Sequence, residues 1–225
     1  MCPVIAPWHT PVCLSLSISH PGEHPSLSIS ALDFRRSLRH IRHMTDPYFF
    51  GYGSLVNRAT HSYADAHRAT LSGWRRTWRV TSLYSQVLLT ATPCAHSKIQ
   101  GLIALVPGHD WAALDARERG YDRQHASHQI RHDTGRDIEA QIYAVDPQKH
   151  QSPAKALPIW LSYLDVVVQG YLREFGEDGV VAFFDTTDGW HMPVEDDRAA
   201  PRYPRAQQLS REERALTDRM LRRVV

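Results

Sequence analysis

The sequence predicts an α+β fold in which a mixed, curved or closed, small β-barrel-like sheet is flanked by helices. The first observation is the order of the expected elements, which runs as strands, one short helix, further strands and then helices. This order lacks the regular strand–helix alternation of a doubly wound parallel sheet. The second observation is the composition, because 42% of the 225 residues are hydrophobic and 22% are charged, which is enough apolar mass for a core.

Residues 1–43 differ in composition from the rest of the chain. They are rich in Pro, Ser and His and show no sustained period, so we expect a disordered N-terminal extension there. Alternatively, these residues are an upstream extension added by the choice of too early a start codon, because Met44 would be a natural first residue. A secretory signal at residues 12–18 and a targeting role for the basic segment 33–43 are alternatives. The expected domain covers residues 44–225.

Three strands are expected in the first half of this domain. Their apolar, aromatic and β-branched positions are typical of buried or half-buried strands. The predicted ranges are 48–56, 67–82 with a break at Gly73, and 98–107. A helix is expected next, over residues 110–121, with Asp110 as its N-cap and Gly120 at its end.

Two further strands and two helices complete the prediction. The strands are expected at 128–133 and 136–146, joined by a turn at Thr134 and Gly135 as in a β-hairpin. A long helix is expected over 157–176, with Pro158 near its start and Gly176 at its end. The last helix is expected over 211–223, behind an N-cap at Ser210, with its apolar side chains packed on the domain or in a dimer contact.

Several classes of function are disfavoured by the composition. A net charge of +2 without a lysine-rich patch gives no reason to expect a nucleic-acid partner. The three cysteines are an odd number, so a disulfide framework is not expected. We therefore expect the protein in a reducing cytoplasm. No apolar run approaches the roughly 20 residues that a membrane span needs. The oligomeric state is left open.

The most informative stretch is the glycine-rich loop that follows the first strand. Glycines on both sides of Tyr52 let the backbone turn sharply and let a ligand approach the main chain. Successive N–H groups in such a turn can hold a carboxylate or a carbonyl oxygen. A tight turn between buried segments is the alternative. Val56 breaks the dinucleotide-binding pattern, and the position of Ser54 does not fit a nucleophile elbow.

Three segments in this order resemble the gamma-glutamylcyclotransferase superfamily, in its ChaC-like or AIG2-like branch. They read FGYGSL, LSGWRRTWRV and LDARERGYDR, and the resemblance extends from about Tyr48 to Gly170. It implies the fold of that superfamily and a site for a small gamma-glutamyl compound. The site residues that it implies are the catalytic base Glu118, the substrate-binding loop Tyr52, Gly53, Ser54 and Leu55, and the pocket-lining Tyr121 and Tyr163.

The reaction that the resemblance implies is intramolecular. The free alpha-amino group of a gamma-glutamyl compound attacks its own gamma-carbonyl, 5-oxoproline forms, and the attached amine, amino acid or peptide leaves. No metal or other cofactor is needed. Glutathione, gamma-glutamyl amino acids and gamma-glutamyl amines are all candidate substrates. A non-catalytic binding module of the same fold, and a hydrolase or lyase acting on another amide, are the alternatives.

Glu118 has two interpretations from the residues alone. Its neighbours are densely charged, which is usual for a solvated helix face. On the predicted helix, however, Leu114, Glu118 and Tyr121 fall at i, i+4 and i+7, so the carboxyl group would point inward with apolar neighbours. Burial would then raise its pKa, as a general base near neutral pH requires.

Other groups of polar residues have weaker claims to a site. The histidines at 125, 128 and 132 would share a metal-binding face on a helix, but the alternating pattern around them favours solvent-facing strand residues. Arg75 and Arg76 would either neutralise a substrate carboxylate or point outward from a strand. The proline-rich segment 194–206 would either cover the pocket or form a solvated connection.

Overall fold

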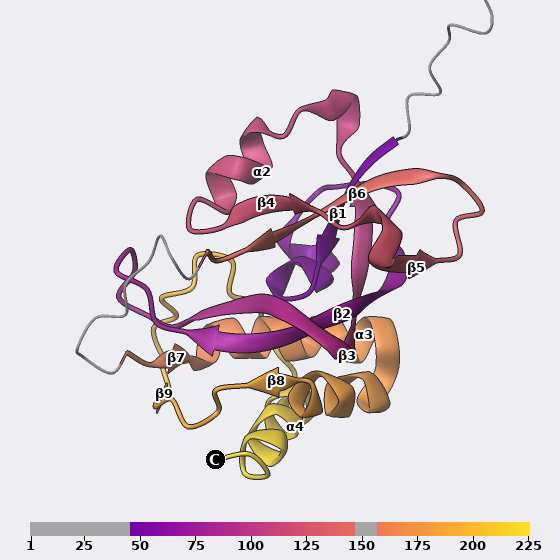
Figure 1. Cartoon of the computed structure of the whole chain (residues 1–225). Coiled ribbons are helices and arrows are strands. Elements are labelled where there is room, and N and C mark those ends of the chain that lie inside the picture. Colours follow the sequence, from indigo (N-terminus) through magenta and orange to yellow (C-terminus); the bar gives the residue numbers. More distant parts are fainter. Residues whose placement is uncertain (1–45, 147–156) are drawn as a thin grey trace, which may run out of the picture. The chain divides into compact units, whose positions relative to one another are not determined.

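The computed structural model describes residues 46–146 and 157–225 (Figure 1). The expected extension at residues 1–43 lies outside the described residues. Within the described residues, no helix combines the length and the apolar character that crossing a bilayer requires.

Seven of the described strands form one mixed sheet, which curls as predicted (Figure 1). Across the sheet the order is β4, β6, β1, β3, β2 and β5, and β8 pairs with β2 outside this path. Strand β1 is central, because it pairs in parallel with β6 and antiparallel with β3. The strands are β1 Asp46–Gly51, β2 His67–Arg79, β3 Leu88–Leu105, β4 Asp122–His125, β5 Ile130–His132, β6 Ile138–Ala144 and β8 Thr187–Asp188.

Helices cover this sheet on both faces. Alternate residues of β1 point to opposite faces. Tyr48 and Phe50 belong to the larger core under the long helix α3, and Phe49 packs with Leu114 of α2 on the other face. Figure 1 shows α3 beside the β2–β3 hairpin, α4 below α3, and α2 near β4. The helices are α2 Ala112–Arg117, α3 Leu161–Asp185 and α4 Arg211–Leu221, with 3-10 helices at Ser54–Val56, Arg58–Thr60, Pro107–His109 and Ser127–Gln129.

The β2–β3 hairpin is longer than the sequence predicted. The break expected at Gly73 is confirmed as a register shift between Ser72 and Trp74. The strand expected at 98–107 is only the second half of β3, which begins at Leu88. Pro93 of β3 pairs with Trp74 at this irregularity, where a strand tolerates proline.

The prediction of a hairpin around Thr134 and Gly135 is wrong. Strand β5 pairs with β2, whereas β6 pairs with β1 and β4. The glycine does turn the chain, with φ of +67°. The local turn was therefore recognised, but the partner of β6 is chosen by burial beside β1, where Ala140 and Ile142 have no exposed surface.

The long helix α3 also departs from the prediction. The strand β7 Ile159–Trp160 precedes it and pairs with β9 Val194–Glu195. The helix was expected to end at Gly176, and the helical backbone is interrupted there, with φ of +71° and ψ of −171°. A second helical stretch follows this kink and continues to Asp185, where Val180, Phe183 and Phe184 are buried. The last helix was predicted well, and a capping box at Ser210 starts it.

Candidate active site

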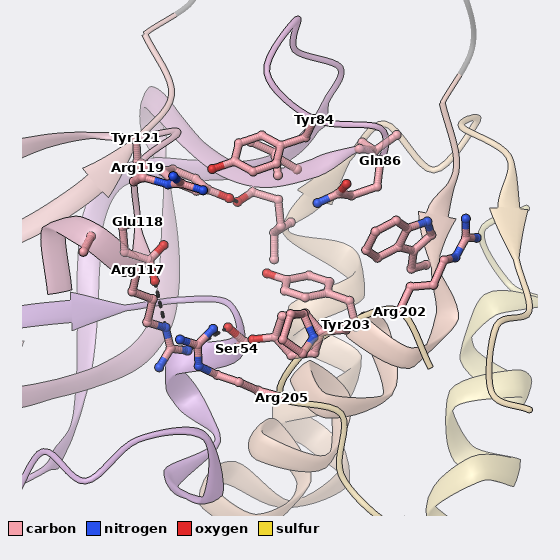
Figure 2. Close-up of a pocket in the computed structure, with 17 residues that line it drawn as sticks. Ser54, Tyr84, Gln86, Arg117, Glu118, Arg119, Tyr121, Arg202, Tyr203 and Arg205 are labelled. Carbon is pink, nitrogen blue, oxygen red and sulfur yellow. Dashed lines mark hydrogen bonds and ion pairs between the residues drawn. The ribbon is translucent and has the colours of Figure 1, made fainter. Parts of the chain in front are cut away.

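A two-part cavity lies between the end of α2, the loop after β1 and the start of α3 (Figure 2). The outer chamber has a volume of about 530 Å³, and a small inner recess of about 30 Å³ adjoins it. Five residues line both parts: Ser54, Leu89, Glu118, Tyr121 and Tyr163. The inner recess brings together all seven predicted site residues: Tyr52, Gly53, Ser54, Leu55, Glu118, Tyr121 and Tyr163.

The glycine-rich loop forms one wall of the inner recess. Strand β1 ends at Gly51, and the 3-10 helix that follows makes its first internal hydrogen bond from the Val56 N–H to the Gly53 carbonyl, at 3.0 Å. The amides of Gly53 and Ser54 precede that bond, at a position where the turn itself provides no acceptor. The Gly53 amide is therefore a suitable donor to a ligand in the recess, whereas the Ser54 amide interacts with the Tyr163 hydroxyl.

A buried arginine holds the peptide that leads into this loop. Arg76 is only 1% exposed, and its Nε donates to the Tyr52 carbonyl oxygen at 3.1 Å. The Tyr171 hydroxyl donates to the same oxygen at 3.0 Å. In a trans peptide the N–H points away from the C=O, so these bonds direct the Gly53 N–H to the opposite side.

The sequence suggested that Arg75 and Arg76 either neutralise a substrate carboxylate or point outward from a strand, and neither interpretation describes Arg76. It is not exposed on a strand, and it does not line the cavity. It lies against the rings of Tyr171 and Phe183, at 5.0 and 5.2 Å from their centroids. Arg75 does point outward, where its Nε pairs with Asp188 Oδ2 at 2.6 Å. The sequence did not distinguish the two, although adjacent strand residues must face opposite sides.

Tyr163 reaches the loop because position 53 is a glycine. A Cβ on Gly53 would lie 2.7 Å from the Tyr163 hydroxyl oxygen, which is too close for a real contact. The ring of Tyr163 also packs edge-on against Tyr203, with centroids 5.0 Å apart. Burial raises the pKa of Tyr163 well above its ordinary value. Its hydroxyl is therefore neutral at physiological pH and can donate a hydrogen bond into the cavity.

Two other tyrosines use their hydroxyls within the protein. Tyr121 donates to the Leu89 carbonyl at 3.0 Å, and Tyr52 donates to the Tyr143 carbonyl at 2.5 Å. Burial raises the pKa of both phenols. These two side chains therefore shape the recess mainly through their rings. Leu55, which is 7% exposed, contributes apolar packing against the face that holds α2.

Glu118 lies just beyond α2, and not within a longer helix as predicted. The helix has six residues and closes with the bond from the Glu118 N–H to the Leu114 carbonyl, at 2.9 Å. The Tyr121 N–H then bonds to the Glu118 carbonyl at 2.8 Å, which makes a tight turn. Gly120 in this turn packs so closely that a Cβ would lie 2.6 Å from the Tyr84 ring. The turn, and not a helical stripe, directs the carboxyl group into the cavity.

The cavity changes the acidity of Glu118. Its side chain is 16% exposed, and burial raises the pKa of the carboxyl group above its ordinary value. The positive charges of Arg117 and Arg205 act in the opposite direction and are the weaker influence. The group therefore retains a higher proton affinity than a solvated carboxylate, which suits a general base near neutral pH.

Arg117 connects Glu118 to the glycine-rich loop, and sequence analysis missed it. Its Nε lies 3.1 Å from Glu118 Oε1, and its terminal nitrogens donate to the Thr60 carbonyl at 2.9 Å and to Ser54 Oγ at 3.2 Å. The charge-dense segment around it had suggested a solvated face, but the Arg117 side chain is only 8% exposed. Its contacts hold the carboxyl group at a set position relative to the loop.

The raised pKa of Glu118 predicts a dependence of stability on pH. Below its unfolded-state pKa, near 4.5, both states hold the proton and the group does not affect stability. As the pH rises from there through the higher folded-state pKa, the native state loses stability, and the loss is constant above it. Glu118→Gln should therefore raise the urea midpoint at pH 7, and the gain should vanish by about pH 4. An equal gain at both pH values would contradict the raised pKa.

The histidines weighed as a metal face lie on separate elements. His125 ends β4, His128 lies in a 3-10 helix and His132 ends β5. The three histidines are therefore not on one face of a helix. Among the described residues, no three His, Cys, Asp or Glu side chains are grouped as a metal ion would require.

The wall of the outer chamber includes the segment that sequence analysis expected to be a solvated connection. Residues 202–205 line the chamber, together with Tyr84, Gln86 and Trp160. Asp197 fixes this segment to the start of α3, because its carboxylate accepts from the Ser162 N–H at 2.8 Å and from the Arg202 N–H at 2.9 Å. The alternative that this segment covers the pocket is thus the one that agrees with the structure.

Comparisons with known proteins agree with this architecture. The family model described as "Gamma-glutamyl cyclotransferase, AIG2-like" matches residues 49–161. YkqA from Bacillus subtilis has the same fold, with a TM-score of 0.50 and 17% identity over 67% of this chain and 56% of YkqA. A structure described as a gamma-glutamyl cyclotransferase gives a TM-score of 0.48 and 13% identity, over 76% of this chain and 98% of its own. A yeast gamma-glutamyl cyclotransferase specific to glutathione gives 0.42 and 12%, over 80% and 97%. No curated protein matches the chain.

Proposed function

Since the chain belongs to the gamma-glutamyl cyclotransferase, AIG2-like family, we propose that it converts a gamma-glutamyl compound into 5-oxoproline with Glu118 as the general base. The alpha-amino nitrogen forms a bond to the gamma-carbonyl carbon, and the bond from that carbon to the attached nitrogen breaks. The observation that supports this proposal best is a buried carboxyl group of raised pKa in one recess with a glycine-rich backbone loop.

Glu118 would move one proton twice. An alpha-amino group has a pKa of about 8, so near neutral pH most of it is protonated and cannot attack. The fraction of the substrate with a neutral amine attacks, a carboxylate of raised pKa takes a proton from that nitrogen as the bond forms, and it then gives this proton to the leaving nitrogen. General acid–base catalysis of this kind contributes about 10²- to 10⁴-fold.

The loop would stabilise the charge that develops during the attack. The gamma-carbonyl oxygen becomes negative as its carbon becomes tetrahedral. Gly53 lines the recess, and its amide would be the donor; one such donor is worth about 3 kcal/mol in comparable sites. Because the small recess forces the glutamyl chain to fold back, it also orients the amine toward the carbonyl, an effect of about 7 kcal/mol or more in well-oriented intramolecular reactions.

The test is a product assay with several gamma-glutamyl compounds. The protein is incubated with glutathione, gamma-glutamyl dipeptides and gamma-glutamyl amines, and 5-oxoproline and glutamate are separated and quantified. We expect 5-oxoproline with at least one of them. Glutamate in its place would indicate a hydrolase. Saturable binding without either product would indicate a non-catalytic binding module and would overturn the proposal.

A further inference from the structure

The outer chamber is strongly biased toward positive charge. Four arginines line it, and Glu118 is the only acidic residue among its described lining residues. The arginines are Arg117, Arg119, Arg202 and Arg205. Such an excess of guanidinium groups near one carboxyl group gives the chamber a positive potential that attracts an anion.

Two of these arginines are already paired within the protein. Arg117 is bound to Glu118. Arg202 forms an ion pair with Glu195, and its guanidinium lies 4.6 Å from the centroid of the Trp160 ring. Their charges are therefore largely satisfied before any ligand binds.

Arg119 and Arg205 differ from them. Among the described residues, neither side chain makes a hydrogen bond or an ion pair. In the view of Figure 2, Arg119 lies above Glu118 and Arg205 lies below it. Both are exposed at the chamber, so solvent or a ligand can reach them. Two unpaired guanidinium groups thus flank the group that is proposed to protonate the leaving nitrogen.

The segment that contains Arg205 is held in place before a substrate binds. Arg198 pairs with Asp165 of α3 at 2.7 Å and with Asp218 of α4 at 2.8 Å, and Asp197 binds Ser162 and Arg202 as described above. A preorganised recognition group loses less conformational entropy when a ligand binds than a free loop does.

Resting on the proposed function, we propose that the leaving portion of the substrate is an amino acid whose carboxylate binds Arg119 and Arg205. In a gamma-glutamyl amino acid this carboxylate is on the carbon next to the scissile nitrogen. When that nitrogen is beside Glu118, the carboxylate must lie close to it, between the two guanidinium groups. Guanidinium groups bind carboxylates through paired, charge-assisted hydrogen bonds and repel a cationic leaving amine.

A matched pair of substrates isolates this contact. Gamma-glutamyl-alanine and gamma-glutamyl-alaninamide share the glutamyl carboxylate and differ only in the carboxylate of the leaving portion. We expect kcat/KM for the acid to exceed that for the amide by about 10- to 100-fold, the range of a hydrogen bond to a charged group. Equal values for the two substrates would overturn the proposal.

Substitutions then assign the preference to the two arginines. The double variant Arg119→Gln and Arg205→Gln should reduce the acid-to-amide ratio at least tenfold, mainly through KM for the acid. Arg222→Gln, an exposed arginine at the end of α4, is the control and should keep the wild-type ratio. An unchanged ratio in the double variant would show that these arginines do not read the carboxylate.

A binding measurement separates this proposal from the proposed function. Calorimetry with the Glu118→Gln variant compares the Kd values of the acid and the amide without turnover. Tighter binding of the acid, lost in the double arginine variant, supports the recognition of the carboxylate even if the wild type forms no 5-oxoproline. Product formation combined with equal binding of acid and amide would overturn the recognition proposal and leave the proposed reaction standing.

Discussion

Replacement of Glu118 with glutamine is expected to slow 5-oxoproline formation by about 10²- to 10⁴-fold. Glutamine keeps the size of the side chain and can still accept a hydrogen bond from Arg117, but it cannot take a proton from the substrate amine. The measurement is kcat from single-substrate kinetics, with circular dichroism to confirm folding. Glu177→Gln is the matched control, because that carboxyl group is 69% exposed and lies outside the cavity, and it should keep wild-type activity.

The same substitution defines how the activity depends on pH. In the wild type the rate should fall as the pH drops through the raised pKa of Glu118, because the protonated group cannot act as a base. This acid limb should be absent from the residual activity of Glu118→Gln. A variant that retains more than a tenth of the wild-type kcat, with the same acid limb, would exclude Glu118 as the base.

Replacement of Arg76 with methionine is expected to lower the free energy of unfolding by about 2–4 kcal/mol. The change removes hydrogen bonds to the Tyr52 and Gln100 carbonyls and to Thr186 Oγ1, all in buried surroundings. It also removes the contact with the Tyr171 ring. The Tyr171 hydroxyl lies within hydrogen-bond distance of both carbonyls and can donate its one proton to either, so the loss is smaller than for fully unsatisfied groups. Urea denaturation measures it.

A matched variant and a kinetic readout separate positioning from stability. Arg75→Met removes the neighbouring, partly exposed pair with Asp188, which should change stability by only about 1 kcal/mol or less. In Arg76→Met, kcat should fall about tenfold or more with a small change in KM, because the Gly53 amide loses its orientation. Equal stability losses in the two variants, or an unchanged kcat in Arg76→Met, would contradict this role.

Local patterns predicted the inner recess better than the topology around it. The glycines, the aromatic residues and the resemblance placed the loop at Tyr52, Glu118 and Tyr163 in one site, and all three line the recess. The predicted reason for the direction of Glu118 was wrong, because α2 ends at Arg117, before Glu118, and a tight turn directs the side chain. Residue types thus indicated the chemistry, whereas the backbone path depended on packing against Tyr84.

Features that depend on distant contacts could not be predicted. Strand β6 pairs with β1, which lies about 90 residues earlier in the chain, and no local pattern records that partner. Gly176 was recognised as a helix end, but the second helical stretch that follows it to Asp185 was not predicted. Arg205 lies in a proline-rich loop whose sequence indicates only a turn. Adjacent residues of a strand face opposite sides of the sheet, so either Arg75 or Arg76 had to be buried. The sequence alone does not say which of the two faces inward.

The wall of the outer chamber is assembled from two separate stretches of the polypeptide. The base and the glycine-rich loop lie within residues 49–161, the span that the family model matches, whereas Arg202 to Arg205 lie beyond it. A change in the later stretch can thus alter which compound is admitted while the reacting groups stay as they are. Grafting residues 196–206 from a relative would be a direct way to change the substrate preference of the protein while keeping its reacting groups.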